Sequence, residues 1–178
     1  MSAGALAETS ALMARSDYLT AAIEAAEAAG RIHVDYLDHP LAVREKGRRA
    51  DLVTAADAAA ERAAIERLKA DFPRASFLAE ESGSQPGSSS ERWIIDPLDG
   101  TTNYAHGYPI FCASIAFERA GEIICGVIHA PAMRETFVAE RGSGATLNGK
   151  PLRVSKIETM ADSLVCTGFQ PARYERNM

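Results

Sequence analysis

Apolar residues recur every three or four positions in two stretches of the first half of the chain, the spacing of helices with one buried face. The first stretch predicts a helix over residues 16–38, in which Ser16 and Asp17 supply N-cap chemistry and Pro40 follows the end. The apolar positions that define this first helix are Leu19, Ile23, Ala26 and Ile32.

The second stretch predicts a helix over residues 54–71, just ahead of Pro73. Thr54 as N-cap and Asp57 three residues later come close to a capping box. The apolar face of this helix consists of Ala60, Ala64, Ile65 and Leu68. Between the two helices, the charged residues 43–50 indicate a loop or a mobile hairpin.

From residue 76 onward the pattern changes to short apolar runs separated by turn residues, which predicts strands. Residues 83–90 are rich in Gly, Ser and Pro and indicate a loop, and Asn148-Gly149 is a strong signal for a type I′ hairpin turn. The expected strands are 76–79, 92–96, 111–118, 123–130, 136–140, 145–147, 152–154 and 163–167. The prediction is therefore an α+β fold, with two long helices packed on a mainly antiparallel sheet.

The composition fits one globular domain, with 178 residues of which 47% are apolar. We expect residues 1–15 to form a flexible tail and residues 16–178 to form the domain. The net charge of −5 argues against a nucleic-acid-binding surface. Three widely spaced cysteines indicate buried, reduced thiols. The N-terminus does not resemble a secretory signal, and no apolar run approaches the roughly 20 residues that span a bilayer. We therefore expect a cytoplasmic protein.

Acidic residues gather where two of the predicted strands end. The apolar run Trp93-Ile94-Ile95 ends in Asp96, Pro97 should lead the chain out of the sheet, and Asp99-Gly100 supplies a turn. Thr101-Thr102 can then cap a short helix, and the pair Glu80-Glu81 ends the preceding strand. If the two strands are neighbours, up to four carboxylates converge.

Such a group repels itself unless protons or cations neutralise it, and Mg²⁺ prefers carboxylate ligands together with phosphate oxygens. Backbone amides of Gly100 and Thr101 at a helix N-terminus suit a phosphate group. Taken singly, each feature has an ordinary explanation: Asp-Gly as a turn, Glu-Glu as a solvated face, and Asp57 as an acid favoured in the first turn of a helix. Together, at strand ends around one turn, they favour metal-assisted phosphoryl chemistry. His106 and His129 lack metal-ligand spacing.

Four segments resemble motifs of the inositol monophosphatase family, within the lithium-sensitive phosphatase superfamily. Residues 93–104 are similar to its first metal-binding motif, 78–83 to the acidic motif before it, 51–57 to the start of its second helix, and 148–155 to a later hairpin. The resemblance covers about residues 17–167, and Thr102-Asn103-Tyr104 is similar to the inositol phosphatase branch. It implies the N-terminal, metal-binding half of a layered α/β sugar-phosphatase fold.

The resemblance also implies the metal ligands, for two to three Mg²⁺ ions in the intact family site. Glu80, Asp96 and the backbone carbonyl of Leu98 would hold the first ion. Asp96 and Asp99 would bind the second. Lys46 matches a lysine that the family carries on a mobile loop near the metals.

Catalytic roles carried over in the same way fall on three side chains and two amides. Thr101, hydrogen-bonded to Asp57, would orient a metal-bound water, and Glu81 would assist through a water contact. The amides of Gly100 and Thr101 would hold phosphate oxygens. The expected substrate is inositol monophosphate or a similar polyol phosphate, and the expected full-length form is a homodimer, with no nucleic acid or membrane partner.

The chain departs from the family in lacking its later segment, which includes a Trp-Asp motif and most contacts to the substrate alcohol. Trp93 is the only tryptophan. We therefore expect a weak second metal site and apolar surface exposed where that segment would pack. Two alternatives stay open: a phosphatase of histidinol phosphate or a 3′-phosphoadenosine nucleotide, and a non-catalytic regulatory protein on the same fold.

Overall fold

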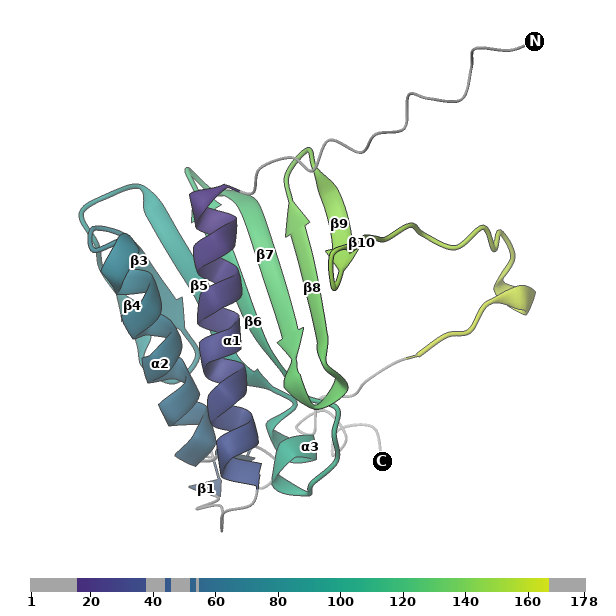
Figure 1. The fold of residues 1–178 in the computed structure, drawn as a ribbon, viewed down its shortest axis with the longest axis horizontal. Helices are drawn as coiled ribbons and strands as arrows, with labels where there is room; N and C mark the ends of the chain where they lie inside the picture. Colours follow the sequence, from purple (N-terminus) through teal and green to yellow (C-terminus); the bar gives the residue numbers. More distant parts are fainter. Residues whose placement is uncertain (1–15, 38–43, 46–51, 54, 167–178) are drawn as a thin grey trace, which may run out of the picture.

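The computed structural model describes residues 16–37, 44–45, 52–53 and 55–166. Two long helices, α1 (Asp17–Leu37) and α2 (Ala55–Asp71), lie side by side on one face of an eight-stranded sheet (Figure 1). Both helices match the predicted ranges closely. The tail expected over residues 1–15 and the helix cap expected at Thr54 lie outside the described residues.

The large sheet has the strand order β10-β9-β8-β7-β6-β5-β3-β4. Only β3 and β5 pair in parallel, and all other neighbours in this sheet are antiparallel. The predicted α+β class is thus confirmed. The strands are β3 (Ser76–Ala79), β4 (Gly83–Gln85), β5 (Glu91–Asp99), β6 (Cys112–Arg119), β7 (Glu122–Ala130), β8 (Glu135–Glu140), β9 (Gly144–Leu147) and β10 (Lys150–Pro151).

Short elements complete the described part of the chain. Two-residue strands β1 (Arg44–Glu45) and β2 (Leu52–Val53) pair antiparallel, as the hairpin prediction allows. Helix α3 (Thr101–Ala105) follows β5, and the 3-10 turns η1 (Pro131–Met133) and η2 (Met160–Asp162) lie later. Within the described ranges, no helix combines the length and the hydropathy that a bilayer-spanning segment needs.

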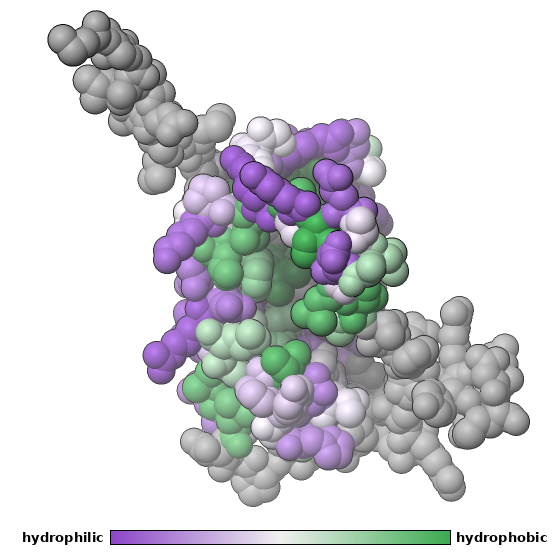
Figure 2. Space-filling view, turned by 90° about the vertical axis from the view of Figure 1, so that its right-hand side faces the viewer, coloured by the Kyte–Doolittle hydropathy of each residue, from purple (hydrophilic) through white to green (hydrophobic). Residues whose placement is uncertain are grey.

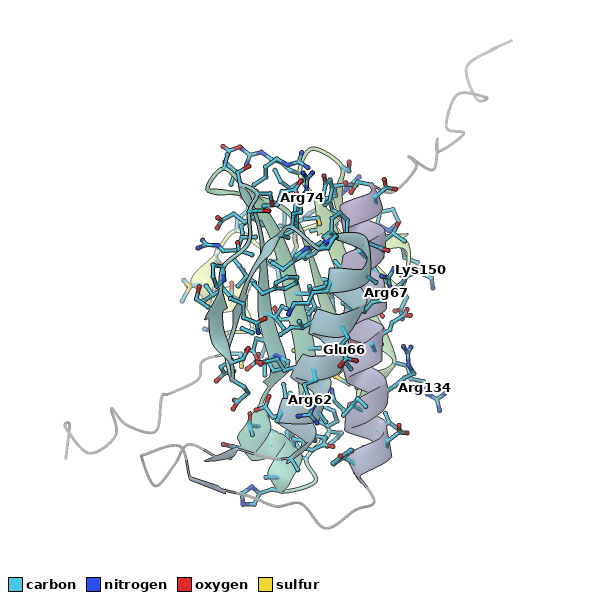
Figure 3. The ribbon with its side chains drawn as sticks, turned by 90° about the vertical axis from the view of Figure 1, so that its left-hand side faces the viewer. Arg62, Glu66, Arg67, Arg74, Arg134 and Lys150 are labelled. Carbon is cyan, nitrogen blue, oxygen red and sulfur yellow. The ribbon has the colours of Figure 1, made fainter. Side chains whose placement is uncertain are left out.

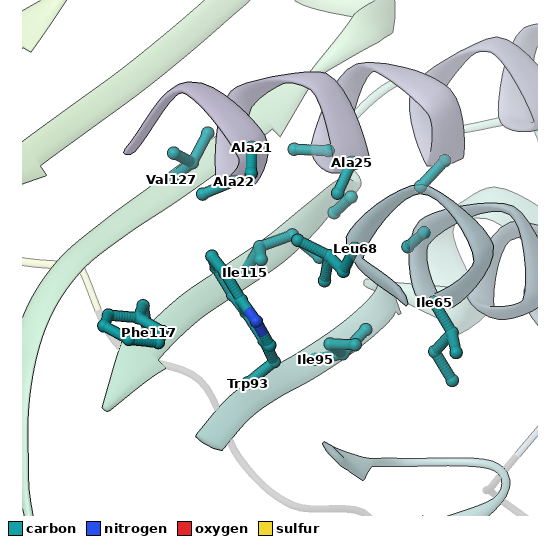
Figure 4. Packing of buried hydrophobic residues seen from close by; sticks show 14 of the residues in the cluster. Ala21, Ala22, Ala25, Ile65, Leu68, Trp93, Ile95, Ile115, Phe117 and Val127 are labelled. Carbon is teal, nitrogen blue, oxygen red and sulfur yellow. The ribbon is translucent and has the colours of Figure 1, made fainter. Parts of the chain in front are cut away.

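The core lies between the helices and one face of the sheet (Figure 4). The helices contribute mainly small residues, because α1 buries five alanines, and the sheet contributes large ones. Trp93 is fully buried, with ring centroids 4.8 Å from Phe117 and 5.3 Å from Phe72. Small helical side chains let α1 approach the sheet closely, so the bulky strand residues fill the remaining space. At Gly30 the approach leaves no room for a side chain, since a Cβ there would lie 2.4 Å from Cδ2 of His129.

The outward side of α2 is charged, with Arg62, Glu66 and Arg67 projecting away from the sheet (Figure 3). Arg67 forms ion pairs with Glu24 of α1 and Asp71 of its own helix. These groups are partly exposed, and such pairs are typically worth only about 0.2–1 kcal/mol. The helix layer is therefore held chiefly by its apolar side.

The opposite face of the sheet is covered by neither α1 nor α2 (Figure 1). It carries exposed or half-buried apolar side chains, and a shallow hollow of about 280 Å³ lies on it, lined among others by Ala116, Ile128, Phe137 and Leu152. Viewed from the side of β10, the molecule shows apolar surface around a hollow (Figure 2). We call the face of the sheet that lies opposite α1 and α2 the open face. Apolar surface is thus exposed on the open face.

Several predicted elements are wrong. Residues 152–154 and 163–166 are exposed and form no strand: among the described residues β10 is the last strand, and η2 lies between the two segments. Within the expected loop at 83–90, Gly83–Gln85 pair with β3 as β4. Pro97 does not end its strand: β5 continues to Asp99 through an irregularity between Asp96 and Asp99. A bulge accommodates the missing proline N–H within the strand.

Candidate active site

The parallel pairing of β3 and β5 brings the acidic residues together. Leu78 pairs with Ile94 and Ala79 with Ile95, and the Glu80 amide donates to the Ile95 carbonyl at 3.2 Å. Glu80 therefore lies beside Asp96, since parallel strands end at the same edge. Because successive strand residues alternate between faces, both acids fall on the open face.

The electrostatics of Asp96 identify the centre of this acidic group. Burial, followed by the charges of Glu80 and Asp99 and a hydrogen bond with the Glu80 side chain, raises the pKa of Asp96 to about 7. Its Oδ1 atom is shielded from solvent and has no hydrogen-bond partner among the described residues. A crowded carboxylate with one unmet oxygen suits a divalent cation, which would relieve the repulsion.

Not all predicted ligands stand in a closed group. Among the described residues, no three His, Cys, Asp or Glu side chains are placed closely enough to hold a metal ion together. The structure shows a Glu80–Asp96 pair with Asp99 close enough to raise the pKa of Asp96. Lys46 lies outside the described residues.

The turn after β5 depends on Gly100, which has φ of 88°. A Cβ at this position would lie 2.8 Å from the Ile110 carbonyl oxygen, so both the backbone conformation and the available space require glycine. Gly100 is also the N-cap of α3, whereas the sequence had suggested Thr101-Thr102. The Thr101 hydroxyl instead donates to the Leu98 carbonyl at 2.9 Å. That bond ties the first residue of α3 to the turn.

Helix α2 contributes buried acids from the other side of the sheet. Asp57 is fully buried in its first turn. One turn later, the buried Glu61 carboxylate accepts the amide of Glu81 at 2.8 Å and that of Ser82 at 3.0 Å. Glu61 therefore fixes the turn that carries Glu80 and Glu81.

Sequence reasoning missed Glu61. Its spacing offered a signal, because it lies four residues after Asp57 and three before Ala64 and so belongs to the buried face of α2. An acid at an apolar position of a helix indicates a buried partner, here two backbone amides.

His106 and His129 lie outside this group and have ordinary surroundings, whereas Cys112 borders it, since its thiol lies 4.0 Å from a carboxylate oxygen of Asp99. Nδ1 of His106 lies 2.8 Å from the Thr102 carbonyl, and Nδ1 of His129 lies 2.9 Å from the Thr136 hydroxyl. Burial raises the pKa of the Cys112 and Cys125 thiols to about 11, which disfavours the nucleophilic thiolate. All three cysteines are free, but Cys112 is half-buried and Cys166 is exposed, so the expectation of buried thiols is confirmed for Cys125 alone.

Comparison with known proteins gives a consistent result. A model of the inositol monophosphatase family matches residues 14–176. The chain is 44% identical over 160 residues to inositol-1-monophosphatase of Mesorhizobium japonicum. The matched region covers 88% of this chain and 60% of that protein. The chain is 41% identical over 151 residues to histidinol-phosphatase of Chlorobaculum parvum, covering 84% and 58% respectively.

A solved structure agrees with the fold. The inositol monophosphatase of Anabaena superposes with a TM-score of 0.76 at 43% identity, over 89% of this chain and 57% of that one. The chain thus spans about 60% of the length of the curated relatives it matches.

Proposed function

Because the chain belongs to the inositol monophosphatase family, we propose that it is the metal-binding portion of a cytoplasmic, Mg²⁺-dependent phosphomonoesterase. The proposed substrate is inositol monophosphate or a similar polyol phosphate, and the proposed full-length form is a lithium-sensitive homodimer without nucleic acid or membrane partners. The observation that carries the proposal is the contact between Glu80 and Asp96 at the ends of two adjacent parallel strands. A raised carboxylate pKa in such a position is a common mark of a functional site.

The residues present fit the metal ion. Glu80, Asp96 and the Leu98 carbonyl would hold one ion, and Asp96 with Asp99 would hold a second, of the two to three ions proposed for the complete site. When bound, the ion supplies a water of lowered pKa and neutralises charge on the phosphate. The Leu98 carbonyl accepts the Thr101 hydroxyl and keeps a second lone pair for this purpose.

Other residues of the chain would orient the reactants. The Thr101 hydroxyl uses its proton toward Leu98, so its oxygen can accept a hydrogen bond from the attacking water. Asp57 and Glu81 would assist in positioning that water, while the amides of Gly100 and Thr101 would hold phosphate oxygens. Lys46 would contact the site from its loop. Rate enhancement would come from positioning and charge neutralisation.

A second substrate class is favoured by one relative, since the Chlorobaculum parvum protein is a histidinol-phosphatase. The same acids would serve either substrate, because both are phosphate monoesters. The other open alternative is a regulatory protein without catalysis. Such a protein would release phosphate from none of these esters.

The test is Mg²⁺-dependent phosphate release from inositol 1-phosphate and histidinol phosphate. It compares this chain with a chimera in which the chain replaces the matching part of the Mesorhizobium japonicum relative. We expect Mg²⁺-dependent release by the chimera, faster with inositol 1-phosphate. Asp96→Asn should abolish it, and Glu122→Gln, an exposed acid at the other end of the sheet, should not change it. A chimera inactive on both substrates would contradict the proposal, as would full activity of Asp96→Asn.

A further inference from the structure

His33 is an unusual residue for its place in α1. The inward face of this helix otherwise buries alanine, leucine and glycine, yet His33 is fully buried as well. Its Nε2 atom lies 2.9 Å from the carbonyl oxygen of Pro97, in the strand segment between Asp96 and Leu98. The imidazole thus reaches from the helix layer to the backbone beside two proposed metal ligands.

The protonation of the ring follows from its contacts. Burial, the main cause, lowers the pKa of His33 to about 4, so the ring is neutral at pH 7. A carbonyl oxygen can only accept, so Nε2 carries the proton and donates it to Pro97. Nδ1 is then a buried acceptor, and it has no partner among the described residues. An apolar residue of similar size would avoid that unmet group, so the bond to Pro97 is the feature that distinguishes histidine here.

A second hydrogen bond ties the same residue to α3. The Tyr104 hydroxyl donates to the main-chain carbonyl of His33 at 2.6 Å. The Tyr104 ring packs edge-on against Phe111, with centroids 4.8 Å apart. Residue 33 therefore contacts both ends of the segment from Pro97 to Tyr104.

This segment needs such ties because strand pairing is interrupted there. Pro97 has no N–H to donate, and the pairing of β5 with β6 shifts between Asp96 and Asp99. The interrupted stretch contains the Leu98 carbonyl, and the turn at Gly100 follows it directly. The bond from the His33 side chain to the Pro97 carbonyl and the bond from the Tyr104 side chain to the His33 carbonyl take the place of regular ladder bonds at this point.

We propose that His33 is a positioning residue for the metal site, holding the Pro97 peptide so that the Asp96 carboxylate and the Leu98 carbonyl face one ion. This inference rests on the proposed function, since it presumes an ion at Asp96. His33 would not touch the ion or the substrate. It would act through the backbone, as residues that orient metal ligands commonly do.

The first experiment measures Mn²⁺ binding to the 178-residue chain by calorimetry. His33→Leu removes the donor, and His33→Gln keeps an N–H near the position of Nε2. Leu19→Ala, buried at the other end of α1, is the control for general loss of stability. We expect His33→Leu to weaken binding about tenfold, as for other residues that orient metal ligands. His33→Gln should recover most of this loss, and Leu19→Ala should lower the unfolding midpoint without changing affinity.

The second experiment needs no metal. Hydrogen exchange of the amides from Leu98 to Thr101 should accelerate in His33→Leu, more than in Leu19→Ala, and return toward normal in His33→Gln. If His33→Leu is too unstable to study, Tyr104→Phe removes the second bond and should accelerate the same amides to a smaller extent.

The outcomes separate the two proposals. Unchanged affinity and exchange in His33→Leu would overturn the positioning role alone, and so would an equal loss of affinity in Leu19→Ala. Failure of the unsubstituted chain to bind Mn²⁺ would overturn the proposed metal site. Exchange of the turn amides would still decide whether His33 holds the turn.

Discussion

The two faces of the sheet differ sharply although they alternate along the same strands. On β7, Val127 points toward the helices and is 2% exposed, while its neighbour Ile128 lies on the open face and is 44% exposed. The helix-covered face holds the core around Trp93. The open face holds apolar surface and, on the same side, Glu80 and Asp96.

The difference shows that the candidate site is assembled from both layers. Glu80 and Asp96 lie on the open face, but the side chains that hold their backbone come from the covered face. Glu61 of α2 accepts hydrogen bonds from the amides of Glu81 and Ser82, next to Glu80. His33 of α1 donates a hydrogen bond to the Pro97 carbonyl, next to Asp96. Each helix therefore supports one of the two strands that carry the acids.

The largest expected effect tests the covered face. Trp93→Ala should lower the free energy of unfolding by about 3–5 kcal/mol, because it leaves a cavity between Phe72 and Phe117. Leu78→Ala, at a position 39% exposed on the open face, should cost less than about 1.5 kcal/mol. Urea denaturation measures both. Equal losses would show that the open face is packed in solution.

The next prediction concerns pH and the covered side of the site. The pKa of His33 is about 4 in the folded chain, against an ordinary value of 6.5. Between pH 6.5 and 4, His33 is therefore protonated in the unfolded chain and neutral in the folded chain. Stability should fall as pH drops from 6.5 to 4, with a slope of at most about 1.4 kcal/mol per pH unit from this group. The metal-free chain and its His33→Leu variant should differ in stability by an amount that changes only within this window. Urea midpoints between pH 4 and 7.5 measure it, and a constant difference would contradict the buried neutral ring.

Glu61→Gln tests the support from α2. The amide side chain can accept only one of the two backbone N–H groups, and its own NH₂ faces the other. We expect a loss of about 1.5–3 kcal/mol in the free energy of unfolding, the range for hydrogen bonds to charged groups. Weaker Mn²⁺ binding should accompany it. Glu66→Gln, on the exposed side of the same helix, is the matched control and should change neither quantity. Stability loss with unchanged Mn²⁺ affinity would show that Glu61 supports the fold and not the site.

The smallest effect is expected on the open face itself. Ile128→Thr should change the free energy of unfolding by no more than about 0.5 kcal/mol, since surface substitutions rarely do more. Val127→Thr, one residue earlier, should cost about 1–3 kcal/mol, because it buries a hydroxyl. Light scattering should also show less self-association for Ile128→Thr, because that change reduces exposed apolar surface. Equal stability losses at the two positions would remove the distinction between the faces.

The sequence predicted those elements whose signals are local. The spacing of apolar residues located both helices, and Asn148-Gly149 marked a turn in which both residues have positive φ. The convergence of Glu80 and Asp96 was predicted on the condition that their strands are neighbours, and the parallel pairing of β3 with β5 meets that condition. The strands predicted after Pro151 were wrong, because short apolar runs such as 163–167 resemble strands whether or not a partner strand exists beside them.

Residues that depend on contacts far along the chain were also missed. Glu61 is 20 residues from Glu81, and His33 is 64 residues from Pro97. Neither partner can be read from the helix in which the side chain lies. The N-cap of α3 was misplaced for a similar reason, since Gly100 is required there partly by the Ile110 carbonyl ten residues later.

Gly30 gives the close contact between α1 and β7 a consequence for mutational tolerance. It lies about one helical turn before His33, so a side chain that pushed α1 off the His129 ring would also draw His33 away from Pro97. A substitution that contacts no acidic residue would then loosen the turn beside Asp96. In a library randomised at residue 30 and sorted for ion binding, we expect glycine to be recovered almost alone, as if it were part of the site.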